Sequence, residues 1–91
     1  MKALAAALLI AAAPDPALDM PIAEYVEGNQ RVELHRDAGP CVDNARWAVF
    51  YSGTVRVSGC WILAAGVVQI AWLDGDVTQL PLRVFREPRR L

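Results

Sequence analysis

The side chains of this sequence with the most reactive chemistry are two cysteines and a single histidine. Cys60 and His35 together would supply a thiol nucleophile and a general base, the pair on which covalent catalysis depends. His35 is predicted on the outer side of a strand, however, and an even pair of cysteines in an exported chain is typical of a disulfide. We therefore expect a Cys41–Cys60 disulfide and no catalytic residue.

A metal site would have to combine the cysteines and His35 with a carboxylate such as Asp37 or Asp43. Structural zinc sites usually show ligands paired at short spacing, and no Cys-x-x-Cys motif is present. A redox-active disulfide would also use that short spacing. The sequence thus predicts neither a metal ion nor another cofactor.

Asp74 and Asp76 are carboxylates close in sequence, as in enzymes that cleave glycans with a general acid and base. They flank Gly75 at a hairpin corner, where aspartate stabilises the turn, and a loop tip lacks the apolar pocket that separates the pKa values of two carboxylates. Ser52 and Ser58 stand where turns and exposed strand faces favour serine. We expect a protein that is not an enzyme, with Asp74 and Asp76 as candidate contacts to a partner.

Four arginines gather near the C-terminus: Arg83, Arg86, Arg89 and Arg90. They would suit contact with phosphate, lipid A or an acidic partner, or they would form a solubilising tail beyond an edge strand. No aromatic residues alternate with them, and nine basic residues stand against ten acidic ones over the chain, so nucleic-acid binding is not expected. Arg83 and Arg86 are kept as candidate partner contacts.

Residues 1–13 have the layout of a secretory signal, because Lys2 precedes an apolar run that ends in small residues. The run is shorter than the ~20 residues that span a bilayer as a helix, so no stable membrane span is expected. Residues 14–21 hold three prolines and are interpreted as an extended linker. Removal of the N-terminal run, or its retention as a packed helix, are the two alternatives. Export to the periplasm or beyond would allow a disulfide to form.

Residues 22–87 are expected to form one small β domain, with apolar residues alternating along short segments. Residues 22–27 and 30–35 flank Gly28-Asn29, a two-residue hairpin signal. That turn sets Tyr25 opposite Val32, with the apolar side chains of both strands on one face. Residues 37–44 are rich in turn formers and connect this hairpin to the next strand.

The middle of the domain is predicted to be three further strands over residues 46–51, 54–63 and 67–72, with Ser52-Gly53 as the first turn. Cys60 falls on the opposite face of its strand from the apolar residues. In the preferred register Gly59 lies opposite Trp72, since a large ring covers the backbone that glycine leaves bare.

The last corner is expected to be a three-residue loop over 74–76, which sets Trp72 opposite Thr78 and Ile70 opposite Leu80. Pro81 cannot donate to a strand ladder, so this is predicted to be an edge strand. The fold class is therefore an all-β antiparallel meander of about six strands, curled into a small barrel or sandwich and tied by one disulfide. Arg86 onward is expected to be frayed, with 88–91 as a flexible, arginine-rich tail.

Several short motifs follow one another over roughly residues 31–87: Pro40-Cys41, Gly59-Cys60-Trp61, Val67-Val68, Asp74-Gly75-Asp76, Pro81 and Phe85-Arg86. In this order they resemble a group of short, uncharacterised exported proteins of proteobacteria and their tailed phages. The resemblance implies an exported β domain. It assigns no functional residue, because no activity is established for that group.

The sequence therefore predicts a small exported, non-enzymatic interaction domain that binds or inhibits an envelope protein, its partner unknown. The alternative is a structural component of a phage particle that retains its N-terminal segment. Intact mass separates the two, because export removes the N-terminal run and assembly keeps it.

Overall fold

The computed structural model describes residues 20–88. The predicted signal segment 1–13, the linker up to residue 19 and residues 89–91 of the predicted tail lie outside the described residues. Six strands form one antiparallel sheet in chain order, and a 3-10 helix follows: β1 (Ala23–Glu27), β2 (Gln30–Leu34), β3 (Arg46–Ser52), β4 (Val55–Ala64), β5 (Val67–Trp72), β6 (Val77–Pro81) and η1 (Leu82–Val84).

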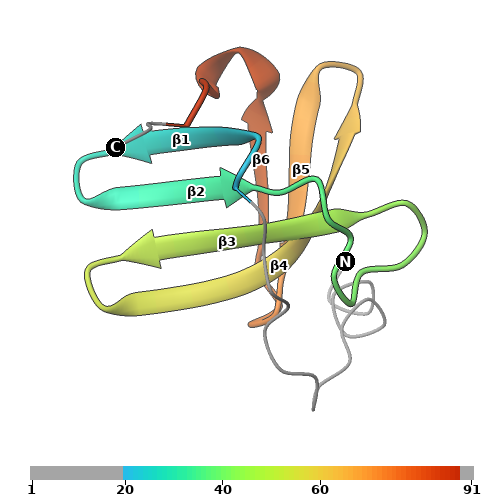
Figure 1. Cartoon of the computed structure of the whole chain (residues 1–91), viewed down its shortest axis with the longest axis horizontal. Coiled ribbons are helices and arrows are strands. Elements are labelled where there is room, and N and C mark those ends of the chain that lie inside the picture. The colour runs from blue at the N-terminus through green and yellow to red at the C-terminus, as the bar shows by residue number, and fades with distance from the viewer. Residues whose placement is uncertain (1–19, 89–91) are drawn as a thin grey trace.

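The sheet curls into a half-barrel because the long strand β4 belongs to both of its halves. Figure 1 shows β1, β2 and β3 running side by side, while β4 bends away and β5 and β6 cross the view steeply. Within residues 20–88, β1 and β6 do not pair with each other, so the sheet has two edges. The all-β meander expected from the sequence is confirmed.

Both faces of the sheet carry apolar side chains, as the near-continuous apolar segments of β3 and β5 require. The concave face holds the larger cluster, whose fully buried members are Leu34, Ala48, Val68 and Ile70. The opposite, convex face holds a smaller cluster around the disulfide, made by Cys41, Ala45, Trp47, Val49 and Cys60. The expectation that Cys60 points away from the main core is therefore confirmed.

Two hairpins have the register that the sequence predicts. In β1–β2, Tyr25 pairs with Val32 around the Gly28–Asn29 turn. In β4–β5, Gly59 pairs with Trp72. The β3–β4 turn differs by one residue from the expected Ser52–Gly53, because Ser52 still pairs with Val55 and the turn lies at residues 53–54.

The last corner is longer than predicted, and the register after it is wrong by two residues. Ile70 pairs with Thr78 instead of Leu80, because the last pair of the ladder is Ala71–Val77 and five residues, 72–76, lie between its two members. The N–H of Leu73 donates to the carbonyl oxygen of Ser58 at 2.8 Å, so Leu73 stays bound to β4 and cannot pair with β6. A shift of two residues keeps each side chain on its predicted face, and the apolar pattern is preserved.

β6 is an edge strand, as Pro81 predicts. The chain after it is not frayed at Arg86, which is a correction. The backbone N–H of Arg86 donates to the carbonyl oxygen of Glu24 at 2.9 Å, and the reverse bond is also 2.9 Å. The segment after η1 therefore returns to β1, and the Phe85 ring lies 6.0 Å from the Tyr25 ring at the rim of the concave core.

Candidate functional site

The concave face of the half-barrel contains a pocket of about 360 Å³ that the core does not fill. Apolar and aromatic side chains make up most of its floor: Tyr25, Val32, Phe50, Val57, Trp72 and Leu80. These residues come from β1 to β6, so the curl of the whole sheet creates the pocket. A volume of this size lies within the range of small-ligand sites, about 300–1,000 Å³.

Strand pairing positions the floor of the pocket. Tyr25 pairs with Val32, Val32 with Phe50 and Phe50 with Val57, so one row of side chains crosses four strands. Directly opposed residues of a sheet share a face, and this row therefore points together into the concave side. β5 does not continue this row, because its last residue, Trp72, pairs with Gly59 and no residue of β5 pairs with Val57. The row is left only half-covered, which is the origin of the pocket.

Trp72 forms the wall of the pocket nearest to β6. Its indole Nε1–H donates to Thr78 Oγ1 at 2.8 Å, and its ring meets the Phe50 ring edge-on at 6.1 Å. Thr78 lies diagonally opposite Trp72 in the ladder, two positions beyond the directly paired residue. The hydrogen bond fixes the ring plane, so the pocket wall is preformed.

Carboxylates border the pocket on two sides. Glu27 ends β1, and Asp74 and Asp76 stand in the loop between β5 and β6. All three residues are exposed. The Tyr25 hydroxyl donates to Glu27 Oε1 at 3.2 Å, and this hydrogen bond raises the pKa of Tyr25 above its ordinary value. Asp74 Oδ1 accepts the backbone N–H of Asp76 at 3.0 Å, as expected for aspartate in a turn.

The convex face carries a cluster of polar and charged side chains. Arg31 lies over the Tyr51 ring at 4.5 Å and its Nε is 3.1 Å from Glu33 Oε2. His35 Nε2 is 3.3 Å from Glu33 Oε1, and this hydrogen bond, opposed by partial burial and aided by the charge of Arg31, lowers the pKa of Glu33. His35 thus lies on the outer, convex face, as the sequence predicts, but it is buried there, with only 2 % of it exposed.

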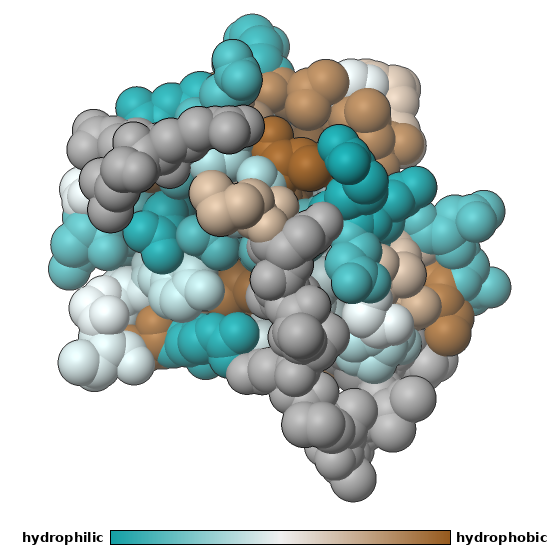
Figure 2. Space-filling model, in the orientation of Figure 1, coloured by the Kyte–Doolittle hydropathy of each residue, from teal (hydrophilic) through white to brown (hydrophobic). Residues whose placement is uncertain are grey.

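Figure 2 shows hydrophilic side chains over much of this view, with apolar atoms gathered near the end of the β4–β5 hairpin. Ile62 and Leu63 near the end of β4 are exposed, as is Leu82, whose N–H donates to the carbonyl oxygen of Gly66 in the β4–β5 turn. Glu24 and Arg86 form an ion pair, in which Nη2 of Arg86 and Oε2 of Glu24 are 3.3 Å apart. Arg86 therefore neutralises a carboxylate of its own chain.

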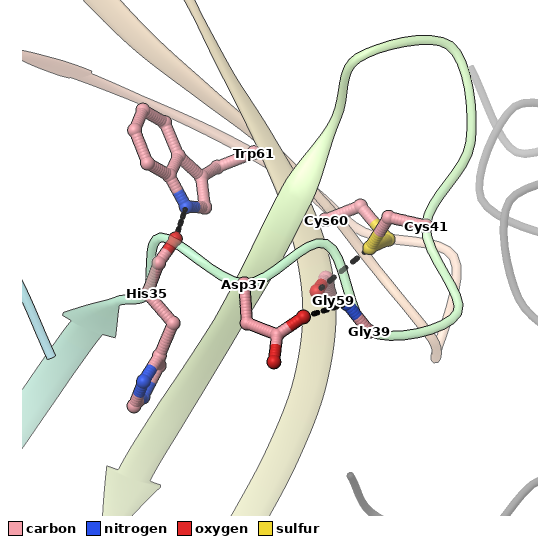
Figure 3. Close-up of a disulfide and its surroundings, with 7 residues drawn as sticks. All are labelled: His35, Asp37, Gly39, Cys41, Gly59, Cys60 and Trp61. Carbon is pink, nitrogen blue, oxygen red and sulfur yellow. Dashed lines mark hydrogen bonds between the residues drawn. A yellow bond between two sulfur atoms is a disulfide. The ribbon is translucent and has the colours of Figure 1, made fainter. Parts of the chain in front are cut away.

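The disulfide fastens the loop after β2 to the centre of β4 (Figure 3). The Cα atoms of Cys41 and Cys60 are 5.9 Å apart, and the predicted bridge is confirmed. Trp61 Nε1–H donates to the carbonyl oxygen of His35 at 3.1 Å, and Asp37 Oδ1 accepts the N–H of Gly39 at 3.0 Å (Figure 3). The loop is thus held to β4 at its start, through Trp61, and at Cys41, through the disulfide, and Cys60 is buried on the convex face.

The four residues expected to contact a partner fall into two groups. Asp74 and Asp76 lie together at the pocket, whereas Arg83 is exposed in η1 and Arg86 is paired with Glu24. Sequence reasoning missed the pocket floor, because aromatic residues in strands were assigned to the core. Val57 is the residue that could have indicated it. Val57 continues the apolar row of β1, β2 and β3 onto β4, and no residue of β5 pairs with it.

The described residues contain no group of three or more histidine, cysteine, aspartate or glutamate side chains placed to hold a metal ion. Over residues 20–88 no helix has the length and apolar character required to cross a membrane. Comparisons with protein-family models, curated proteins and solved structures give no match to this chain.

Proposed function

We propose that this protein is a small exported, non-enzymatic binding domain that holds a segment of an envelope protein in its concave pocket. The pocket itself is the observation that supports the proposal. It is about 360 Å³ in volume, has an aromatic and aliphatic floor, and is lined by residues of both edge strands, β1 and β6. A preformed apolar cavity with a few polar groups at its border is the usual form of a binding site.

The composition of the pocket favours binding over catalysis. Its lining within residues 20–88 includes neither histidine nor cysteine, so a thiol or imidazole is not presented to a ligand there. His35 lies on the convex face against Glu33, and Cys60 is bonded to Cys41. Asp74 is engaged in its own turn. Binding that blocks an envelope enzyme would need the pocket surface alone and no reactive side chain.

Two features support export. The Cys41–Cys60 disulfide is of the kind that persists in oxidising compartments, and residues 1–13 combine a charged start with a short apolar run. Intact mass of the protein recovered from its native host tests this part of the proposal. We expect a loss of about 1.2–1.4 kDa, the mass of the N-terminal run. Full mass together with sedimentation in a phage particle would overturn it in favour of a structural role.

A matched pair of variants tests whether the pocket is the binding surface. Val57→Lys places a long side chain on the pocket floor, whereas Val55→Lys adds the same charge at an exposed position of the same strand, outside the pocket. We expect wild type and Val55→Lys to retain the same envelope protein from an extract and Val57→Lys to lose it, with circular dichroism reporting that all three fold. Equal retention by both variants would overturn the assignment.

A further inference from the structure

The carboxylates at the pocket carry no counter-charge in the part of the chain that the structure describes. Within residues 20–88, Arg31 pairs with Glu33 and Arg86 with Glu24, and no ion pair there involves Glu27, Asp74 or Asp76. Three negative side chains therefore border one cavity without a neutralising partner. A positively charged ligand would gain from this arrangement, and an anionic ligand would be repelled.

Among residues 20–88, Arg31 is the one cationic residue that also borders the pocket, and its charge is directed elsewhere. Its guanidinium lies over the Tyr51 ring and its Nε contacts Glu33. Tyr51 packs against the cluster on the convex face, so this arginine is held on the far side of the sheet. The other side chains that line the pocket are apolar, aromatic, acidic or, at Gln30 and Thr78, polar and uncharged.

The floor also suits a cation. Tyr25 and Phe50 are half-buried at the pocket and Trp72 forms its wall, so aromatic rings lie below the carboxylates. Ring faces attract ammonium and guanidinium groups, and the aliphatic floor at Val57 and Leu80 would accept the methylene stem that carries such a group. The pocket therefore offers an apolar surface to the stem of such a side chain and negative charge to its head.

We infer that the segment bound in the pocket presents a lysine or arginine side chain, so the partner is a protein with a basic, exposed segment. This inference rests on the proposed function and specifies the chemistry of its ligand. The cationic head lies toward Glu27 and Asp76, and the stem crosses the floor formed by Phe50 and Val57. Long-range attraction by the three carboxylates would also speed association at low salt.

Peptide titration of the full-length protein, followed by NMR, tests the inference directly. The probes are trilysine and triarginine, with trinorleucine as a neutral probe of similar length and triglutamate as an anionic one. The indole N–H of Trp72 reports on the pocket wall. We expect shifts of this resonance with either cationic peptide, weakening as salt rises from roughly 50 to 300 mM, and no saturable shift with the other two.

The variant Glu27→Gln with Asp76→Asn removes two charges and leaves Asp74 to cap its turn. We expect the affinity for trilysine to fall about fivefold in this variant, in keeping with partly exposed ion pairs. Unchanged affinity in the variant, or equal binding of trinorleucine, would overturn the inference.

The two experiments together distinguish failure of this inference from failure of the proposed function. If the Val57→Lys variant loses its envelope partner while trilysine fails to bind the wild type, the pocket is a binding site for a ligand that is not cationic, and the inference alone fails. If trilysine binds the pocket but Val57→Lys retains its envelope partner, the proposed function fails.

Discussion

The Trp72 ring packs directly on Gly59, at the point where β4 passes from one half of the sheet to the other. A Cβ atom at Gly59 would lie 2.6 Å from the carbonyl oxygen of Ala71 and 2.8 Å from Cε3 of Trp72. Only glycine leaves that space, and the ring that occupies it is also the wall of the pocket. The bend of the sheet and the shape of the candidate site thus depend on the same contact.

Gly59→Ala is therefore expected to destabilise the fold by about 2 kcal/mol, the usual cost of overpacking a filled site. The backbone oxygen of Ala71 is the nearest atom and cannot rotate away, so strand β5 must move. Urea unfolding measures the loss. Displacement of the Trp72 ring should also change the near-ultraviolet circular dichroism.

Gly53→Ala is the matched control, because a Cβ there would meet nothing within 4 Å. Its cost should be about 1 kcal/mol and come from the positive φ of 58° alone. The near-ultraviolet spectrum should stay that of the wild type. A wild-type spectrum for Gly59→Ala as well would show that the contact with Trp72 is not tight.

Loss of the disulfide is expected to lower the free energy of unfolding by about 3 kcal/mol in the chain-entropy model, given a sequence separation of 19. Cys41→Ala with Cys60→Ala is the suitable variant, since serine would leave hydroxyl groups buried on the convex face. Urea unfolding of the variant and of the reduced wild type should give the same loss. A reduced wild type as stable as the oxidised one would contradict the expectation.

Much of the sheet could be predicted because side chains of alternate residues must share a face. The β1–β2 register followed from Gly28-Asn29, and the β4–β5 register followed from the fit of Trp72 over Gly59. The pairing of Cys41 with Cys60 followed from their being the two cysteines of the chain.

The features that were not predicted depend on hydrogen bonds between distant segments. Leu73 stays on β4 through the carbonyl oxygen of Ser58, which lengthens the last corner. Arg86 returns to Glu24 across the open side of the sheet. The pocket likewise arises from the curl of six strands, and the apolar pattern of one strand does not reveal whether a neighbour will cover it.

Acidification should unfold the protein partly through Glu33. The hydrogen bond with His35 and, less strongly, the charge of Arg31 hold the pKa of Glu33 below its ordinary value of 4.5. A carboxyl whose folded pKa is lowered stabilises the fold above its unfolded pKa, and that contribution is lost as pH falls through the folded value. Melting temperature should therefore fall below about pH 4.5 in the wild type and fall less in Glu33→Gln.

Gln30→Ala serves as the control for a substitution in the same strand, because Gln30 is exposed and neutral. Its melting temperature should follow the wild-type curve between pH 7 and pH 3, a range that spans the titration of carboxyl groups at about pH 4. If Glu33→Gln and Gln30→Ala lose the same stability over this range, the Glu33–His35 contact does not contribute to the acid response.

The wall of the pocket should be held by the hydrogen bond between Trp72 and Thr78. Its length of 2.8 Å and its half-buried position predict a coupling of about 1 kcal/mol in a double-mutant cycle of Trp72→Phe and Thr78→Val. The cycle isolates the bond, because Thr78→Val keeps the shape of the side chain and the loss of ring area cancels between the two backgrounds. Urea unfolding of the four proteins gives the coupling. A value near zero would mean that packing against Phe50 and Gly59 alone orients the indole, and the pocket would then keep its shape without Thr78.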